Sequence, residues 1–133
     1  MHRLALVVSA LVVSVGTATA AGRAPAIRYV DDHFGAILAT PKKQALYYWQ
    51  VEKRAGGKIR CTGSCAKLWP PLYANGAVPR RSKGIAGTFG TIKRPDGRKQ
   101  VTYNGLAVYT YAHEGPTQVL CDDVNGWFVV RLR

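Results

Sequence analysis

The chain contains few side chains of the kinds that build metal and catalytic sites. Its 133 residues include 7 Asp and Glu, 3 Cys, 3 His and one Met, which is Met1. The clusters Asp31-Asp32-His33 and Asp122-Asp123 lack the alternating oxygens and central glycine of a calcium loop, so we expect them in solvated turns. The sequence also lacks a Ser-His-Asp arrangement with a nucleophile elbow and a phosphate-binding glycine loop. We therefore predict that the protein is not an enzyme.

Long hydrophobic runs are absent except at the start of the chain. Arg3 precedes an apolar run from Leu4 to Val15, and small residues follow up to Ala20. This run is shorter than the roughly 20 residues that a membrane-spanning helix needs. The pattern is typical of a cleavable signal peptide over residues 1–20. It predicts a secreted or periplasmic protein without a transmembrane segment after cleavage, and an uncleaved membrane anchor is the alternative.

Negative charge is scarce, because 19 Lys and Arg face those 7 acids and the formal net charge is +12. Such an excess favours anionic partners. For an exported protein these are anionic envelope polymers or phospholipid headgroups. The sequence has no recognition helix, zinc finger or RNA-binding aromatic motif, so no specific nucleic-acid partner is expected. The alternative is that the charge provides only solubility and nonspecific adhesion.

The same landmarks occur twice along the chain in the same order. They are Phe34-Gly35, the segment 46–52, Cys61 and Trp69 in the first half, and Phe89-Gly90, the segment 108–114, Cys121 and Trp127 in the second. An internal duplication explains this order, although chance similarity is the alternative. We predict a flexible lead-in at 21–33 and a single domain over 34–133, built from repeats at about 34–75 and 89–133.

Both predicted repeats have the pattern of β-strands. Tyr47 and Trp49 are two residues apart, as are Tyr109 and Tyr111, which places each pair on one face of a sheet. Asp96-Gly97 and Asn104-Gly105 supply turn residues between extended runs. Only the stretch that ends at Trp69, before Pro70 and Pro71, favours a helical turn. The sequence predicts a mainly β protein, a small antiparallel domain of two repeated hairpin units with at most short helical turns.

These features resemble the bacterial secreted lipoprotein repeat of unknown function. That family has a motif of tyrosine, any residue, an aromatic, two residues and an aspartate. Here the motif falls on Tyr47, Trp49 and Glu52, and again on Tyr109, Tyr111 and Glu114. Further residues carry the resemblance: Cys61, Cys65, Trp69, Pro70, Pro71, Asp96, Gly97, Tyr103 and Gly105.

This chain departs from the family pattern in three ways. Glutamate replaces the aspartate in both copies, no cysteine lies near the predicted cleavage site for lipid attachment, and Cys121 is additional. The resemblance implies an exported envelope protein built from repeats. It implies no reaction.

The cysteines suggest a disulfide or, as the alternative, a metal site. In an oxidising compartment Cys61 and Cys65, four residues apart on a helical turn, have Cα atoms about 6 Å apart and within disulfide range. We favour this pair, with Cys121 free or buried, while a bridge from Cys121 to either of the others stays open. The alternative function is copper binding or thiol redox chemistry by Cys61, Cys65, Cys121 and His113, because thiolate and imidazole suit Cu(I). Otherwise no cofactor is expected, and His113 is expected to be half-buried.

The two motif glutamates have a catalytic and a structural interpretation. Glu52 and Glu114 are two carboxylates at equivalent positions, which could suggest acid and base roles of the glycosidase type. We favour the structural interpretation, in which they accept turn amides or pair with nearby basic side chains. The leading hypothesis is a noncatalytic binding or structural module of the cell envelope.

Overall fold

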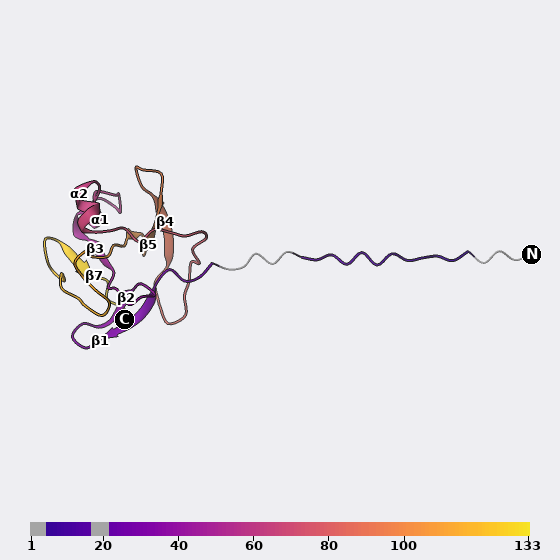
Figure 1. Ribbon diagram of the computed structural model, residues 1–133, viewed down its shortest axis with the longest axis horizontal. Helices are drawn as coiled ribbons and strands as arrows, with labels where there is room; N and C mark the ends of the chain where they lie inside the picture. Colours follow the sequence, from indigo (N-terminus) through magenta and orange to yellow (C-terminus); the bar gives the residue numbers. More distant parts are fainter. Residues whose placement is uncertain (1–4, 17–21) are drawn as a thin grey trace, which may run out of the picture.

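The computed structural model describes residues 5–16 and 22–133, and its folded part begins close to Ala26 (Figure 1). Short strands dominate. The elements in chain order are β1 (Ile27–Asp31), β2 (Gly35–Ala39), β3 (Tyr47–Trp49), α1 (Gln50–Arg54), α2 (Ser64–Leu68), β4 (Phe89–Lys93), β5 (Lys99–Tyr103), β6 (Leu106–Ala107) and β7 (Trp127–Val129). All strand pairs are antiparallel. The predicted mainly β fold with short helical turns is confirmed.

The sheets are of two kinds, because some form within one half of the chain and one joins the two halves. β1 pairs with β2, and β4, β5 and β6 form a meander. Asn104 and Gly105 connect β5 to β6 with φ of 49° and 80°, the left-handed conformation that a tight hairpin turn requires. β3 instead pairs with β7 from the other half, with Trp49 opposite Trp127.

Each half of the chain completes its hairpin with a segment from the other half. We call the segments 69–74 and 127–132 the tails. The Leu38 N–H donates to the carbonyl of Val130 in the second tail at 2.9 Å. At the equivalent place, the Val101 N–H donates to the carbonyl of Leu72 in the first tail at 2.8 Å. Two more pairs of equivalent backbone hydrogen bonds belong to this exchange. The amide of Leu132 donates to the carbonyl of Ala36, as the amide of Ala74 does to Lys99. The amide of Gln50 donates to the carbonyl of Gly126, as the amide of Ala112 does to Leu68. Since buried backbone groups need partners, neither half completes its hydrogen bonding alone.

The core has two parts. One is aromatic and lies where the halves meet, and it contains Tyr47, Trp69, Tyr109 and Trp127. The other is mainly aliphatic, and its members include Leu38, Leu46, Val101, Val108 and Val130. Both parts therefore draw side chains from both halves, as the exchanged tails require.

The start of the first repeat differs from the prediction. Ile27–Asp31 is a strand and not part of a flexible lead-in, because it pairs with all of β2 and the preceding Ala26 is 1% exposed. The carboxylate of Asp31 accepts the amides of His33 and Phe34, which closes a turn between β1 and β2. Residue 21 and the predicted cleavage site lie outside the described residues.

The landmark Phe34-Gly35 is likewise not the counterpart of Phe89-Gly90. Phe34 lies in the turn before β2, whereas Phe89 is the first residue of β4. The matching hydrogen bonds of Leu38 and Val101 make β2 the counterpart of β5 in the repeat, and therefore β1 the counterpart of β4. The prediction was wrong because a Phe-Gly pair recurs by chance one strand out of step.

The helices also depart from the expected distribution. Both α1 and α2 belong to the first half, where one helical turn was predicted. α1 begins directly after β3, at the end of an aromatic segment whose period-two pattern concealed it. Within the parts of the chain that the structure covers, no helix combines the length and hydrophobicity needed to cross a bilayer.

Candidate functional site at the junction of the two repeats

The tyrosine and glutamate of each motif bond across to the other motif. The Tyr47 hydroxyl donates to Oε2 of Glu114 at 2.6 Å, and the Tyr109 hydroxyl donates to Oε2 of Glu52 at 2.7 Å. The two tyrosines are also backbone partners, since Tyr47 N–H bonds the Tyr109 carbonyl at 2.8 Å and the reverse bond is 2.9 Å. All four side chains are buried. The tyrosine and glutamate, five residues apart in each motif, thus form two crossed hydrogen bonds that join the repeats with approximate symmetry.

Each glutamate also fixes the loop that follows it. Oε2 of Glu52 accepts the amides of Arg60 and Cys61 at 2.8 and 3.1 Å, and Oε2 of Glu114 accepts the amide of Leu120 at 2.9 Å. The prediction that these acids accept turn amides is confirmed. Among the described residues, Oε1 of each glutamate is buried without a hydrogen-bond partner. Oε2 of each carboxylate is therefore occupied by the fold, while Oε1 is buried beside it.

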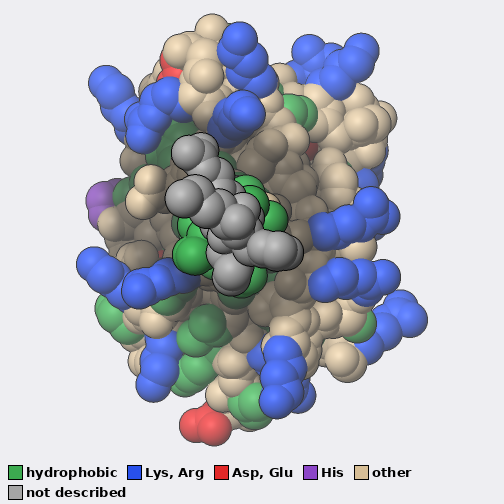
Figure 2. All heavy atoms as spheres, turned by 90° about the vertical axis from the view of Figure 1, so that its right-hand side faces the viewer, with side chains coloured by type: hydrophobic (Ala, Val, Ile, Leu, Met, Phe, Trp, Pro, Cys, Tyr) green, Lys and Arg blue, Asp and Glu red, His purple; other side chains and the backbone are tan. Residues whose placement is uncertain are grey.

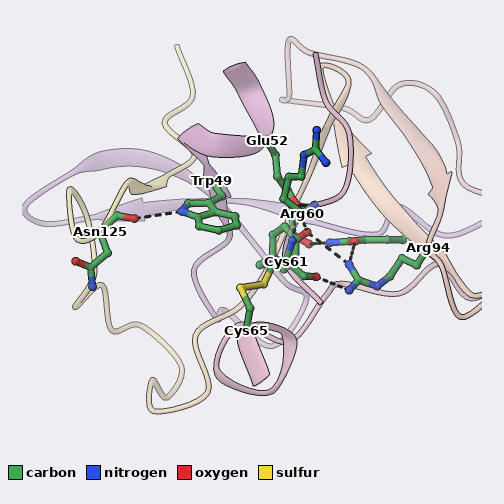
Figure 3. The surroundings of a disulfide bond; sticks show 10 residues. Trp49, Glu52, Arg60, Cys61, Cys65, Arg94 and Asn125 are labelled. Carbon is green, nitrogen blue, oxygen red and sulfur yellow. Dashed lines mark hydrogen bonds between the residues drawn. A yellow bond between two sulfur atoms is a disulfide. The ribbon is translucent and has the colours of Figure 1, made fainter. Parts of the chain in front are cut away.

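The environments of the two glutamates also differ by a buried arginine. Arg94 is 5% exposed, and its guanidinium donates to the carbonyl of Cys61 at 2.6 Å and to Gln100 at 2.7 Å. It also lies 3.5 Å from the Tyr109 hydroxyl, so Tyr109 and Cys61 both connect it to Glu52 (Figure 3). The cation therefore lies in the half of the network that contains Glu52.

Glu114 titrates differently from an ordinary glutamate. Burial raises the pKa of Glu114 above its usual value, and the hydrogen bonds from Tyr47 and Leu120 oppose this shift. Burial likewise raises the pKa of Tyr47 and of Tyr109 well above the usual value, and their bonds to the carboxylates add to the shift. Both phenols are thus neutral hydrogen-bond donors at physiological pH.

Aromatic rings from both repeats form a column beside this network. Trp127 stacks on Trp69 at 4.0 Å between ring centroids and on Trp49 at 5.1 Å, and Trp69 contacts Tyr111 at 4.8 Å. Trp69 and Trp127 hold equivalent positions, as do Trp49 and Tyr111, so the column has the same approximate symmetry. The prediction that Trp69 fills the adjoining core is confirmed by its 5% exposure. Pro71, beside it, forms a bridge with Tyr109.

The cysteines follow the favoured prediction. Cys61 and Cys65 form a disulfide with Cα atoms 5.2 Å apart, and Cys121 is free and buried. Figure 3 shows the disulfide beside the Glu52 and Arg94 contacts. Burial raises the pKa of the Cys121 thiol, and the charge of Glu114 adds to this effect. This thiol is therefore held in its unreactive protonated form.

The structure does not assemble the side chains proposed for copper. Within the described residues, no group of three or more His, Cys, Asp or Glu side chains could hold a metal ion. His113 is exposed and lies edge-on to Tyr111 at 5.5 Å, so the expectation of a half-buried histidine was wrong. The chain turns sharply at 112–113, which directs this side chain away from the strand face.

The remaining motif residues lie in turns or on strands. Asp96 accepts the amide of Arg98 at 2.9 Å, and Gly97 has a φ of 85° that closes the β4–β5 turn. The Tyr103 hydroxyl accepts the amide of Gly87 at 3.1 Å. A Cβ atom at Gly87 would lie 2.3 Å from the Tyr103 ring, so only glycine fits there.

The sequence did not identify a groove of about 680 Å³ beside the junction. Tyr48 and Phe128 line it as a stacked pair, with ring centroids 5.7 Å apart. Lys53, Arg131 and Arg133 are further lining residues. Tyr48 lies inside the first motif, on the opposite face of the strand from Tyr47. The period-two pattern could therefore have indicated that this strand has aromatic residues on both faces.

Two copies of one hairpin unit that exchange their tails define a tandem-repeat β protein. The family described as a secreted repeat of unknown function matches residues 29–73 and again 90–131. The chain belongs to this family, and the resemblance noted from its motifs is confirmed. The two matches start within β1 and β4, in agreement with the repeat boundaries given by the hydrogen bonds. The secreted character of the family agrees with the predicted secreted or periplasmic location. No curated protein and no solved structure matches the chain.

Proposed function

We propose that this protein is exported by a cleavable signal peptide and acts as a noncatalytic module that binds anionic components of the cell envelope. Its described surface is strongly basic. Between residues 22 and 133, every Lys and Arg except Arg94 is exposed. Figure 2 shows Lys and Arg side chains around the whole outline of one face, with few acidic side chains among them. The proposal includes no cofactor.

Two features make the surface more basic than the composition alone indicates. Two of the seven acidic residues, Glu52 and Glu114, are buried and bonded within the fold, where they do not offset surface cations locally. The second feature is that few exposed cations are paired, because the described residues contain one ion pair, between Arg131 and Asp122 at 2.8 Å. Exposed cations without partners keep their full attraction for an anionic surface, and this excess is the observation that carries the proposal.

Salt dependence tests the proposal directly. The protein should sediment with phosphatidylglycerol vesicles or bind dextran sulfate at about 50 mM salt, and release by about 0.5 M as screening shortens the range of the attraction. Neutral phosphatidylcholine vesicles are the control surface. Absent binding, or binding that salt does not weaken, contradicts the proposal.

Charge variants provide a matched comparison. Replacing exposed Arg80 and Lys83 with Ser should weaken binding, because both changes remove surface cations. Asp32→Asn removes an exposed anion and should not weaken it. An equal loss in both variants would indicate damage to the fold instead of lost electrostatic attraction.

A further inference from the structure

The groove beside the junction has an aromatic floor. Tyr48 of β3 and Phe128 of β7 are opposite each other in the strand pair, and their rings stack at an interplanar angle of 23°. Both side chains are only half-buried, although aromatic rings on a paired strand are well suited to burial. The two rings therefore present apolar surface to whatever enters the groove.

The repeat architecture does not account for these two rings. By the correspondence that matches Tyr47 with Tyr109, the counterpart of Tyr48 is Thr110. The counterpart of Phe128 is Pro70, and the Thr110 amide donates to the Pro70 carbonyl at 2.9 Å. The same backbone contact thus forms without aromatic side chains in the other half. The backbone pairing therefore does not require two aromatic rings, although Tyr48 packs in part against the aliphatic core, and the stacked pair is open to a functional explanation.

Polar groups of several kinds surround the aromatic floor. The Lys53 ammonium lies over the Tyr48 ring, 5.6 Å from its centre. Arg133 also lines the groove, and neither cation has an ion-pair partner within the described residues. Asp122 is neutralised locally by Arg131. The remaining polar lining includes Tyr103, Asn104 and Asp123. The Oδ1 atom of Asn104 already accepts the Thr88 amide at 2.9 Å, so Asn104 offers its amide donors and the exposed Asp123 offers acceptors.

We propose that this groove binds an acidic polysaccharide whose sugar rings carry carboxylates. The C–H face of a sugar ring would rest on Tyr48 and Phe128, because the negative face of an aromatic ring attracts weakly positive hydrogens. Lys53 and Arg133 would bind the carboxylates, while Asn104 and Asp123 would hydrogen-bond hydroxyls. The inference rests on the proposed function and adds to it a place and a ligand class.

The arrangement fits a glycan better than other envelope anions. A polyphosphate chain has no apolar face to place on the aromatic floor. A neutral glycan leaves the two free cations unused. A volume of about 680 Å³ suits a few linked sugar rings, which is the size of ligand that such pockets usually hold.

Isothermal titration with three probes tests the ligand class. An oligogalacturonate hexamer should bind the full chain. Maltohexaose, which has the same number of rings without charge, and linear polyphosphate, which has charge without rings, should each bind about tenfold more weakly or not at all. Equal affinity for polyphosphate, or for maltohexaose, would overturn the assignment.

Two variants and one control locate the site. Lys53→Ser should weaken hexamer binding about fivefold, and Tyr48→Leu about tenfold, since each removes one direct contact. Lys93→Ser removes an equally exposed cation from β4, outside the groove, and should change the affinity less than twofold. Lys53→Ser keeps the test valid should Tyr48→Leu disturb folding, because Lys53 is exposed.

The outcomes separate this inference from the proposed function. Equal losses in Lys53→Ser and Lys93→Ser would refute the groove and leave general binding of anions intact. Binding to phosphatidylglycerol vesicles or dextran sulfate without binding to the hexamer would refute it in the same way. No binding to any of the anionic probes would refute both proposals.

Discussion

Tyr109→Phe tests the crossed network most directly, because it removes one oxygen atom and leaves the ring in place. The Tyr109 side chain is fully buried, and its hydroxyl lies 2.7 Å from Oε2 of Glu52 and 3.5 Å from Arg94. The substitution leaves Glu52 with only backbone amides as donors. It also removes the hydroxyl that connects the carboxylate to the buried guanidinium.

The expected cost follows from the partners that are lost. A hydrogen bond to a charged group contributes about 1.5–3 kcal/mol, and the bond to Glu52 belongs to this class. The ring keeps its edge-on contact with Trp127 at 5.1 Å, so little packing is lost. We expect the free energy of unfolding to fall by about 2 kcal/mol, near the middle of that range.

Urea unfolding followed by tryptophan fluorescence measures this loss, since Trp49, Trp69 and Trp127 stack beside the network. The midpoint should fall while the slope with urea stays unchanged. Tyr48→Phe is the matched control. Its hydroxyl makes no hydrogen bond within the described part of the chain, and its loss should cost less than about 0.5 kcal/mol. Equal small losses in both variants would refute a stabilising role for the crossed bond.

Three further predictions concern pH, the disulfide and the exchanged tails. The raised pKa of Glu114 means that its contribution to stability, complete below its unfolded pKa, is lost as pH rises through its folded pKa. Glu114→Gln should therefore gain stability relative to wild type as pH rises above the unfolded pKa of a glutamate, about 4.3, and a stability difference that stays constant with pH in urea titrations would contradict this. Reducing the Cys61–Cys65 disulfide should lower the free energy of unfolding by about 2 kcal/mol, as expected for a loop this short. An unchanged urea midpoint in protein whose reduction is verified by thiol quantification would contradict this stabilisation. A fragment of residues 22–78 should be unfolded or dimeric in sedimentation experiments, because the second tail is missing, and a folded monomer would contradict the exchange.

Local patterns in the chain were sufficient for the fold class and for several contacts. The Asn104-Gly105 and Asp96-Gly97 turns follow from residues that tolerate left-handed backbone, which is a property of each residue by itself. The Cys61–Cys65 disulfide agrees with the four-residue spacing, although Cys61 precedes α2 and the two residues do not share a helical turn. Duplication was visible in the order of landmarks, and the family match confirms it.

The partners of the motif residues could not be predicted in this way. The tyrosine at 47 bonds a glutamate 67 residues away instead of the one five residues away, and no local pattern distinguishes these choices. The exchange of tails arises because β3 pairs with β7, and this also brings Tyr48 to Phe128 and forms the groove. Turns and strand faces depend on neighbouring residues, so the sequence alone determines them. The choice between two nearly identical hairpin partners depends instead on which tertiary arrangement supplies hydrogen-bond partners to the buried backbone and carboxylate groups together.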